Sequence, residues 1–98
     1  MYVVVQHQIK NPPVAFARGE ALIKNEGAPL GVRGLQFYPS RDGSAVTCLW
    51  EAPSVDAVQG YVDTVMGDAS ENTVYEVDAS QAFAKQPSGI RTSAGLPE

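Results

Sequence analysis

The chain contains a single histidine, a single cysteine and a single tryptophan among 98 residues. One cysteine excludes an internal disulfide bridge. No stretch approaches the roughly 20 consecutive apolar residues of a membrane-spanning helix, so the sequence predicts no membrane partner. The opening MYVVVQHQIK lacks the charged start and the long apolar stretch of a secretory signal, which favours a cytoplasmic protein.

Basic residues are also scarce. Seven Lys and Arg against eleven Asp and Glu give a formal net charge of −4. The sequence therefore predicts no nucleic-acid partner, because phosphate backbones require clustered positive charge. A hydrophobic content of 44% with 18% charged residues is ordinary for a globular protein, and a chain of this length has room for one core.

Within residues 1–78 the sequence patterns alternate in the order strand, helix, strand, strand, helix, strand. We expect strands at 2–9, 32–38, 44–51 and 72–78, with helices at 14–25 and 55–65. This order predicts an α+β fold, the ferredoxin-like βαββαβ sandwich, in which two helices cover one face of a four-stranded antiparallel sheet. Residues 79–98 are small and polar and form a predicted C-terminal tail, either mobile or packed on a partner subunit.

The two halves of this domain resemble each other. A shift of 41 positions places Val5 on Val46, His7 on Cys48, Ile9 on Trp50, Pro12 on Pro53 and Val14 on Val55. The repeat predicts that the first and third strands are parallel neighbours in the middle of the sheet. It also predicts that His7 and Cys48 lie close together on one face.

Alternation along the strands assigns the side chains to two faces. The face under the helices is expected to be apolar apart from one imidazole, and comprises Val3, Val5, His7, Ile9, Leu35, Phe37, Val46, Cys48, Trp50, Tyr75 and Val77. The opposite face mixes polar, aromatic and aliphatic residues. Two interpretations of it remain open: a solvated sheet face, or a face covered by a second subunit in a homodimer.

His7 is the side chain expected to titrate near neutral pH. It is either a core imidazole that hydrogen-bonds a backbone carbonyl or Tyr75, or a general base or metal ligand. Cys48, in an apolar strand, is typical of a small buried hydrophobe. The candidate lining of a ligand pocket between sheet and helices consists of Cys48, Trp50, Tyr61, Tyr75 and Phe37.

Acidic side chains supply the candidate metal ligands. Glu51 and Glu76 fall on one predicted face, among glutamines. Because oxygen ligands suit hard and borderline divalent cations, His7, Glu51 and Glu76 are the candidate metal set. A solvated charged face is the alternative.

The segment CLWEAPSVDAV, residues 48–58, resembles a C-x-aromatic-E-A-P motif followed by an acidic amphipathic helix. This motif occurs in a family of small bacterial ferredoxin-like proteins of uncharacterised function that includes a nickel-binding protein. The opening YVVV and the closing YEV are similar as well, so the resemblance spans residues 1–78. It implies a dimeric α/β barrel and binding of a divalent metal such as nickel.

The sequence thus predicts a homodimer that binds a small ligand or a metal ion. Two alternatives remain. The first is a cofactor-independent monooxygenase or isomerase that acts on an aromatic or polyketide-like molecule, with His7 as the base. The second is a structural or assembly protein.

Overall fold

Four strands and two α-helices follow one another in the predicted order in residues 1–90, the part of the chain that the computed structural model describes. They are β1 (Tyr2–Ile9), α1 (Pro12–Ile23), β2 (Arg33–Pro39), β3 (Ala45–Glu51), α2 (Val55–Met66), a short 3-10 helix (Gly67–Ala69) and β4 (Ser70–Glu76). The predicted boundaries agree to within two residues. The fold is ferredoxin-like, as the order of patterns predicted.

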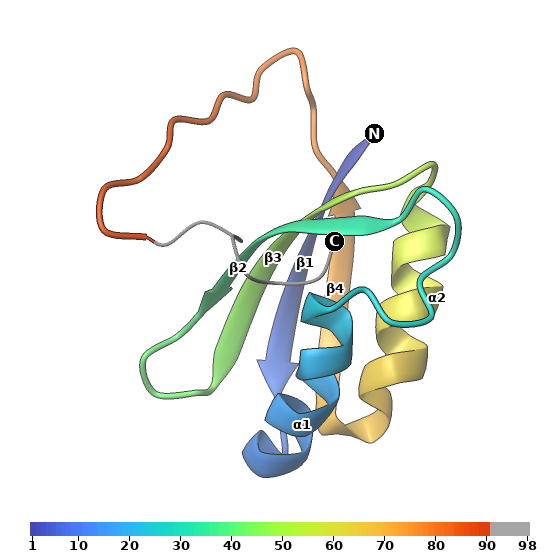
Figure 1. Cartoon of the computed structure of the whole chain (residues 1–98), viewed down its shortest axis with the longest axis vertical. Coiled ribbons are helices and arrows are strands. Elements are labelled where there is room, and N and C mark those ends of the chain that lie inside the picture. The colour runs from blue at the N-terminus through green and yellow to red at the C-terminus, as the bar shows by residue number, and fades with distance from the viewer. Residues whose placement is uncertain (91–98) are drawn as a thin grey trace.

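The sheet has the strand order β2-β3-β1-β4, and every neighbouring pair is antiparallel (Figure 1). The prediction that β1 and β3 are parallel is therefore wrong, although they are central neighbours as expected. In the antiparallel register Val5 pairs with Cys48, and His7 pairs with Val46. His7 and Cys48 consequently meet on a diagonal of the same face rather than directly opposite each other.

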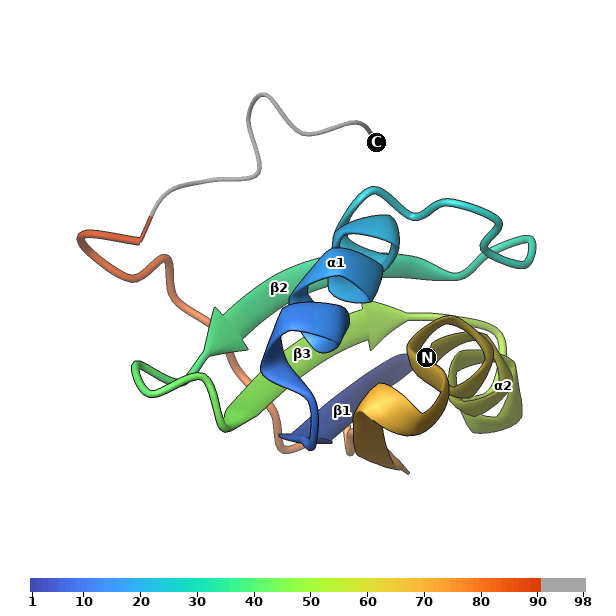
Figure 2. The ribbon, with the colours of Figure 1, turned by 90° about the horizontal axis from the view of Figure 1, so that it is seen from below.

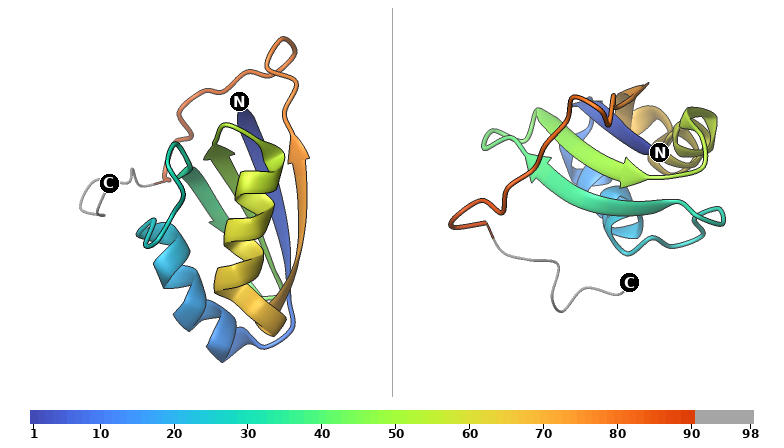
Figure 3. Two further views of the ribbon diagram at one scale, coloured as in Figure 1. Left: turned by 90° about the vertical axis from the view of Figure 1, so that its right-hand side faces the viewer. Right: turned by 90° about the horizontal axis from the view of Figure 1, so that it is seen from above.

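Each helix begins at a residue whose side chain accepts a hydrogen bond from the first turn. Ser54 caps α2 through an Ala57 N–H···Oγ bond of 3.0 Å. Asn11 caps α1, where two prolines occupy the first turn without removing a helical hydrogen bond. Both helices lie against one face of the sheet (Figures 2 and 3). Helix α2 packs beside β4, whereas α1 contacts β2.

The core lies between the sheet and the helices. Its fully buried side chains are Val3, Val5, Val58 and Val62. Helix α2 contributes Val58, Tyr61, Val62 and Met66 to this core, whereas α1 buries only Ala15 and Leu22. Helix α1 begins two residues earlier than predicted.

The assignment of β4 side chains to faces is wrong. The register pairs Val5 with Val74 and Val4 with Tyr75. Because directly paired residues share a face, Val74 lies under the helices and Tyr75 lies on the open face, where it is 48% exposed. A shift of one residue reverses every side chain of a strand, and alternation within β4 could not reveal it.

Residues 77–90 contain no helix or strand and extend away from the sheet beyond the end of β4 (Figure 1). The rest of the predicted tail, residues 91–98, lies outside the described residues. Within residues 1–90, neither helix has the length and apolar character needed to cross a membrane.

Candidate functional site

A cavity of about 240 Å³ lies between α1 and the sheet, near the end of β1. It is lined by His7, Ile9, Ala15, Phe16, Gly19, Glu20, Ile23, Phe37, Pro39, Val46 and Met66. Glu20 is exposed, and its carboxylate forms an ion pair of 3.4 Å with Lys24. His7 is therefore the only buried polar side chain of the wall, and apart from the exposed Glu20 the other lining residues are apolar.

Small side chains on α1 make room for this cavity. Ala15, Gly19 and Ile23 are four residues apart, so they lie on one face of the helix, and all three line the cavity. Apart from the adjacent residues and the helix's own backbone, no atom lies within 4 Å of the position that a Gly19 Cβ would occupy. On the opposite wall Phe37 extends from β2, which confirms its predicted place on the face under the helices.

The imidazole of His7 has a hydrogen-bond partner at each ring nitrogen. Nδ1 lies 2.7 Å from Asn72 Oδ1 on β4, and Nε2 lies 3.5 Å from Cys48 Sγ on β3. The predicted proximity of His7 and Cys48 is confirmed. The suggested partner Tyr75 is wrong, because its side chain lies on the other face of the sheet.

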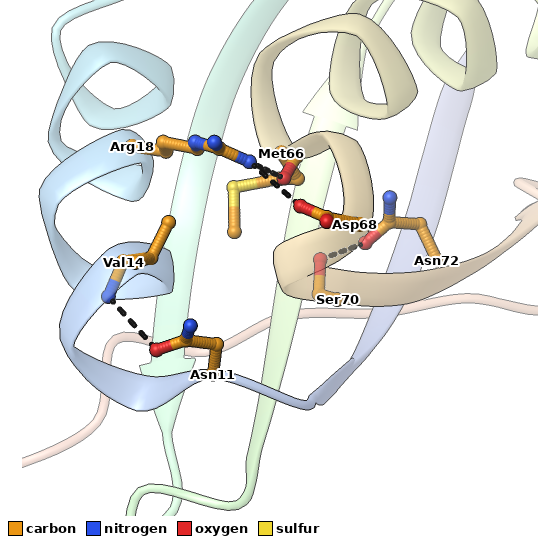
Figure 4. Close-up of polar contacts among 7 residues, drawn as sticks. All are labelled: Asn11, Val14, Arg18, Met66, Asp68, Ser70 and Asn72. Atoms are coloured by element: carbon orange, nitrogen blue, oxygen red, sulfur yellow. Dashed lines mark hydrogen bonds and ion pairs between the residues drawn. The ribbon is translucent and has the colours of Figure 1, made fainter.

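Three further contacts hold Asn72 in place. Its Oδ1 accepts from Ser70 Oγ at 2.7 Å (Figure 4). Its Nδ2 donates to Asp63 Oδ1 of α2 at 2.9 Å. Gln59, one turn before Asp63, donates to the backbone carbonyl of Asn72 at 3.2 Å and to Asp63 Oδ2 at 2.9 Å. A continuous chain of hydrogen bonds therefore runs from Cys48 through His7 and Asn72 to Asp63.

Close by, Arg18 of α1 holds the end of α2. Its Nη1 donates to the carbonyl oxygen of Met66 at 2.8 Å and lies 3.3 Å from Asp68 Oδ1 (Figure 4). A cation at the carbonyl end of a helix is favourable, because the last carbonyls have no partner within the helix. This contact joins the two helices where Met66 reaches the cavity.

Burial governs the protonation of the site. It lowers the pKa of His7 below 6.5, against the opposing effects of the Asn72 hydrogen bond and the Asp63 charge. Burial also raises the pKa of the Cys48 thiol to about 12. At neutral pH the imidazole is therefore neutral and the thiol keeps its proton. Cys48 is not an activated nucleophile.

The other predicted pocket residues lie elsewhere. Trp50 pairs with Val3 at the opposite end of the sheet and makes an edge-on contact with Tyr61, with ring centroids 5.9 Å apart. The Tyr61 hydroxyl donates to the Glu26 carbonyl at 2.6 Å. The structure therefore brings His7 and Phe37 into the cavity wall and leaves Cys48, Trp50, Tyr61 and Tyr75 outside it.

The predicted metal set is not brought together. Glu51 lies on the open face and forms an ion pair of 3.1 Å with Arg33. Glu76 pairs with Val3, far along the strands from His7 and on the face opposite Glu51. Among the described residues, no group of three or more His, Cys, Asp and Glu side chains is placed to hold a metal ion.

Sequence reasoning missed Asn72 and Asp63. Asparagine is depleted in strands, so its position inside a predicted strand was a usable signal. Asp63 belongs to a helix, and no pattern within the strands connects it with His7.

The chain has the ferredoxin-like α+β fold with a helix-covered cavity that contains one imidazole. It is similar in structure to Rv0793 from Mycobacterium tuberculosis, with a TM-score of 0.50 and 18% sequence identity over 78% of this chain and 93% of that one. At this identity the likeness supports the fold alone. No protein-family model matches the sequence, and no curated protein matches it.

Proposed function

We propose that this protein binds a small, largely apolar molecule in the cavity beneath α1. The observation that carries the proposal is the cavity wall, in which one buried imidazole stands among apolar side chains. Ligand sites typically combine an apolar lining with a few placed polar groups. The volume of about 240 Å³ lies below the roughly 300–1,000 Å³ of drug-sized sites, so the ligand is expected to have one or two rings.

A small molecule is favoured over a divalent metal such as nickel. The candidate ligands His7, Glu51 and Glu76 are on different faces and at different ends of the sheet. A lone imidazole supplies one of the several ligands that borderline metals require. Membership of the family that includes a nickel-binding protein remains a proposal supported by the motif at residues 48–53.

Two glycines allow a matched test of the cavity. Gly19 lies within α1 and lines the cavity, whereas Gly60 lies within α2 and does not; a Cβ meets no atom within 4 Å at either position. Replacing a helical glycine by leucine improves helix propensity by roughly 0.8 kcal/mol. Both variants are therefore expected to fold.

The measurement is binding of toluene and phenol by ligand-observed NMR. We expect Gly19→Leu to abolish binding, because the new side chain fills the cavity, and Gly60→Leu to bind as the wild type does. Failure of the wild type to bind either probe would refute the proposed site. Equal binding by both variants would place the ligand elsewhere.

Cofactor-independent catalysis is the second candidate function. It is favoured by one observation, the presence of a neutral imidazole in the cavity wall. A probe that binds can be incubated with the wild type and with His7→Gln. Conversion of the probe that requires His7 would support an enzyme, and its absence across binding probes would leave a binding protein.

We also propose that the open sheet face pairs with that of a second copy. Tyr2, Tyr38 and Tyr75 are between 36% and 48% exposed on this face. Its charged strand residues are ion-paired, Arg33 with Glu51 and Glu71 with Lys10. An aromatic sheet face whose charged strand residues are ion-paired suits self-association. Sedimentation equilibrium tests this proposal: a dimer that Tyr75→Lys dissociates supports it, and a monomeric wild type contradicts it.

A further inference from the structure

The orientation of the Asn72 amide follows from its neighbours. The Asp63 carboxylate is an acceptor only, so the group 2.9 Å from it must be the Asn72 NH₂. The amide oxygen then faces His7 Nδ1 at 2.7 Å. Because an amide oxygen also only accepts, Nδ1 of His7 must carry a proton. The carboxylate on α2 thereby determines the tautomer of an imidazole that it does not touch.

The second ring nitrogen is consequently an acceptor. A neutral imidazole has one N–H, so a proton on Nδ1 leaves a lone pair on Nε2. The present partner of Nε2 is the Cys48 thiol at 3.5 Å, which is a weak donor. A hydroxyl is a stronger donor, so a ligand hydroxyl that reaches Nε2 forms a better hydrogen bond than the thiol does.

The acceptor nitrogen of the ring points to the β3 side of β1, although its partner Cys48 does not itself line the cavity. Strand β1 lies between β4 and β3, and Nδ1 points to Asn72 on β4 while Nε2 points to Cys48 on β3. The strand residues that line the cavity come from β1, β3 and β2, and none comes from β4. Nε2 is therefore on the side where a ligand lies.

We propose that Asn72 and Asp63 are positioning residues that hold the His7 proton on Nδ1, so that the cavity presents an acceptor and selects apolar molecules bearing a hydroxyl donor. This inference rests on the proposed function of the cavity. It specifies that the ligand carries a hydrogen-bond donor. A phenol-like or enol-like compound is preferred over its hydrocarbon analogue and over a compound that only accepts hydrogen bonds.

The tautomer is measured without any ligand. In the wild type labelled with ¹⁵N-histidine, we expect NMR spectra at pH 8 to show a protonated Nδ1 and an unprotonated Nε2. Asp63→Asn removes the acceptor-only partner, so the Asn72 amide can flip, and a fraction of the Nε2–H tautomer should appear. Asp56→Asn, the same change in the first turn of α2, should leave the spectrum unchanged. A wild type with the proton on Nε2 would overturn the inference.

Ligand selection is measured as the ratio of phenol to toluene affinity. A hydrogen bond of ordinary strength corresponds to about 3- to 10-fold in binding, so His7→Phe should lower the ratio by that factor. Cys48→Ser places a competing hydroxyl beside Nε2 and should lower it as well, whereas Cys48→Ala should raise it.

The outcomes separate the two proposals. A ratio that stays the same in all three variants refutes hydroxyl selection and leaves the cavity as an apolar binding site. Failure of both probes to bind the wild type refutes the cavity as a ligand site, and with it the selection. A ratio that changes in the three stated directions, with the Nδ1–H tautomer, supports the inference.

Discussion

Lowering the pH from 7 to 5 should destabilise this protein through His7. The imidazole is 4% exposed, and burial lowers its pKa in the folded state. In the unfolded chain the same group takes up a proton near its ordinary pKa of 6.5. The unfolded state therefore binds more protons below pH 6.5, and the stability present above that pH is lost as the pH falls toward the folded-state pKa.

The size of the effect is bounded by the single proton involved. The free energy of unfolding can fall by at most about 1.4 kcal/mol for each pH unit between the two pKa values. The hydrogen bond to Asn72 and the charge of Asp63 raise the folded-state pKa of His7 and so oppose the effect of burial. The loss of stability should therefore end at a higher pH than burial alone would produce. Asp63→Asn removes that charge and should extend the decline to lower pH.

Urea unfolding followed by Trp50 fluorescence measures this dependence, because the chain has one tryptophan and it is buried. The carboxyls with lowered pKa values, Asp42 and Asp78, change protonation below pH 4 and do not contribute in this range. His7→Leu is the control and should show a flat profile between pH 7 and 5. A flat wild-type profile, or a variant that keeps the slope, would refute the assignment of a buried neutral imidazole.

Three further predictions concern the rest of the chain. Ser54→Ala should lower stability in urea by about 1 kcal/mol, and Asn11→Ala by less, because its cap bond is 3.5 Å long rather than 3.0 Å. Cys48, with its pKa raised to about 12, should resist alkylation in the native protein at pH 8 and react readily in 8 M urea (about the usual denaturing concentration); rapid native labelling would contradict its burial. Asp42 accepts hydrogen bonds from the Ser44 backbone and from two serine hydroxyls, which lower its pKa to about 2, so its contribution is present above pH 3.8 and lost as the pH falls through 2. Asp42→Asn should therefore lower the urea midpoint at pH 5 but not at pH 2, and equal losses at both would argue against this carboxylate.

Half of the candidate site was predictable from local patterns. The run Val3-Val4-Val5 and the alternation that follows place His7 on the inner face of β1, and alternation places Phe37 on the same side in β2. The internal repeat of 41 positions correctly predicted that His7 and Cys48 lie close together, but it assigned the wrong relative direction to their strands. It implied parallel strands, whereas the two residues actually meet diagonally across an antiparallel pair.

The amino-acid sequence by itself determined the order and type of the elements, because β-branched runs, proline punctuation, helix caps and the apolar stripe of α2 act within a few residues of one another. Only the tertiary structure decided which side chains of β4 face the helices, because the register with which β4 pairs with β1 assigns them to a face. That pairing turns Asn72 toward His7 and Tyr75 away from it. The packing of α2 against β4 then brings Asp63 to Asn72, and the small residues of α1 leave the cavity open beside the imidazole.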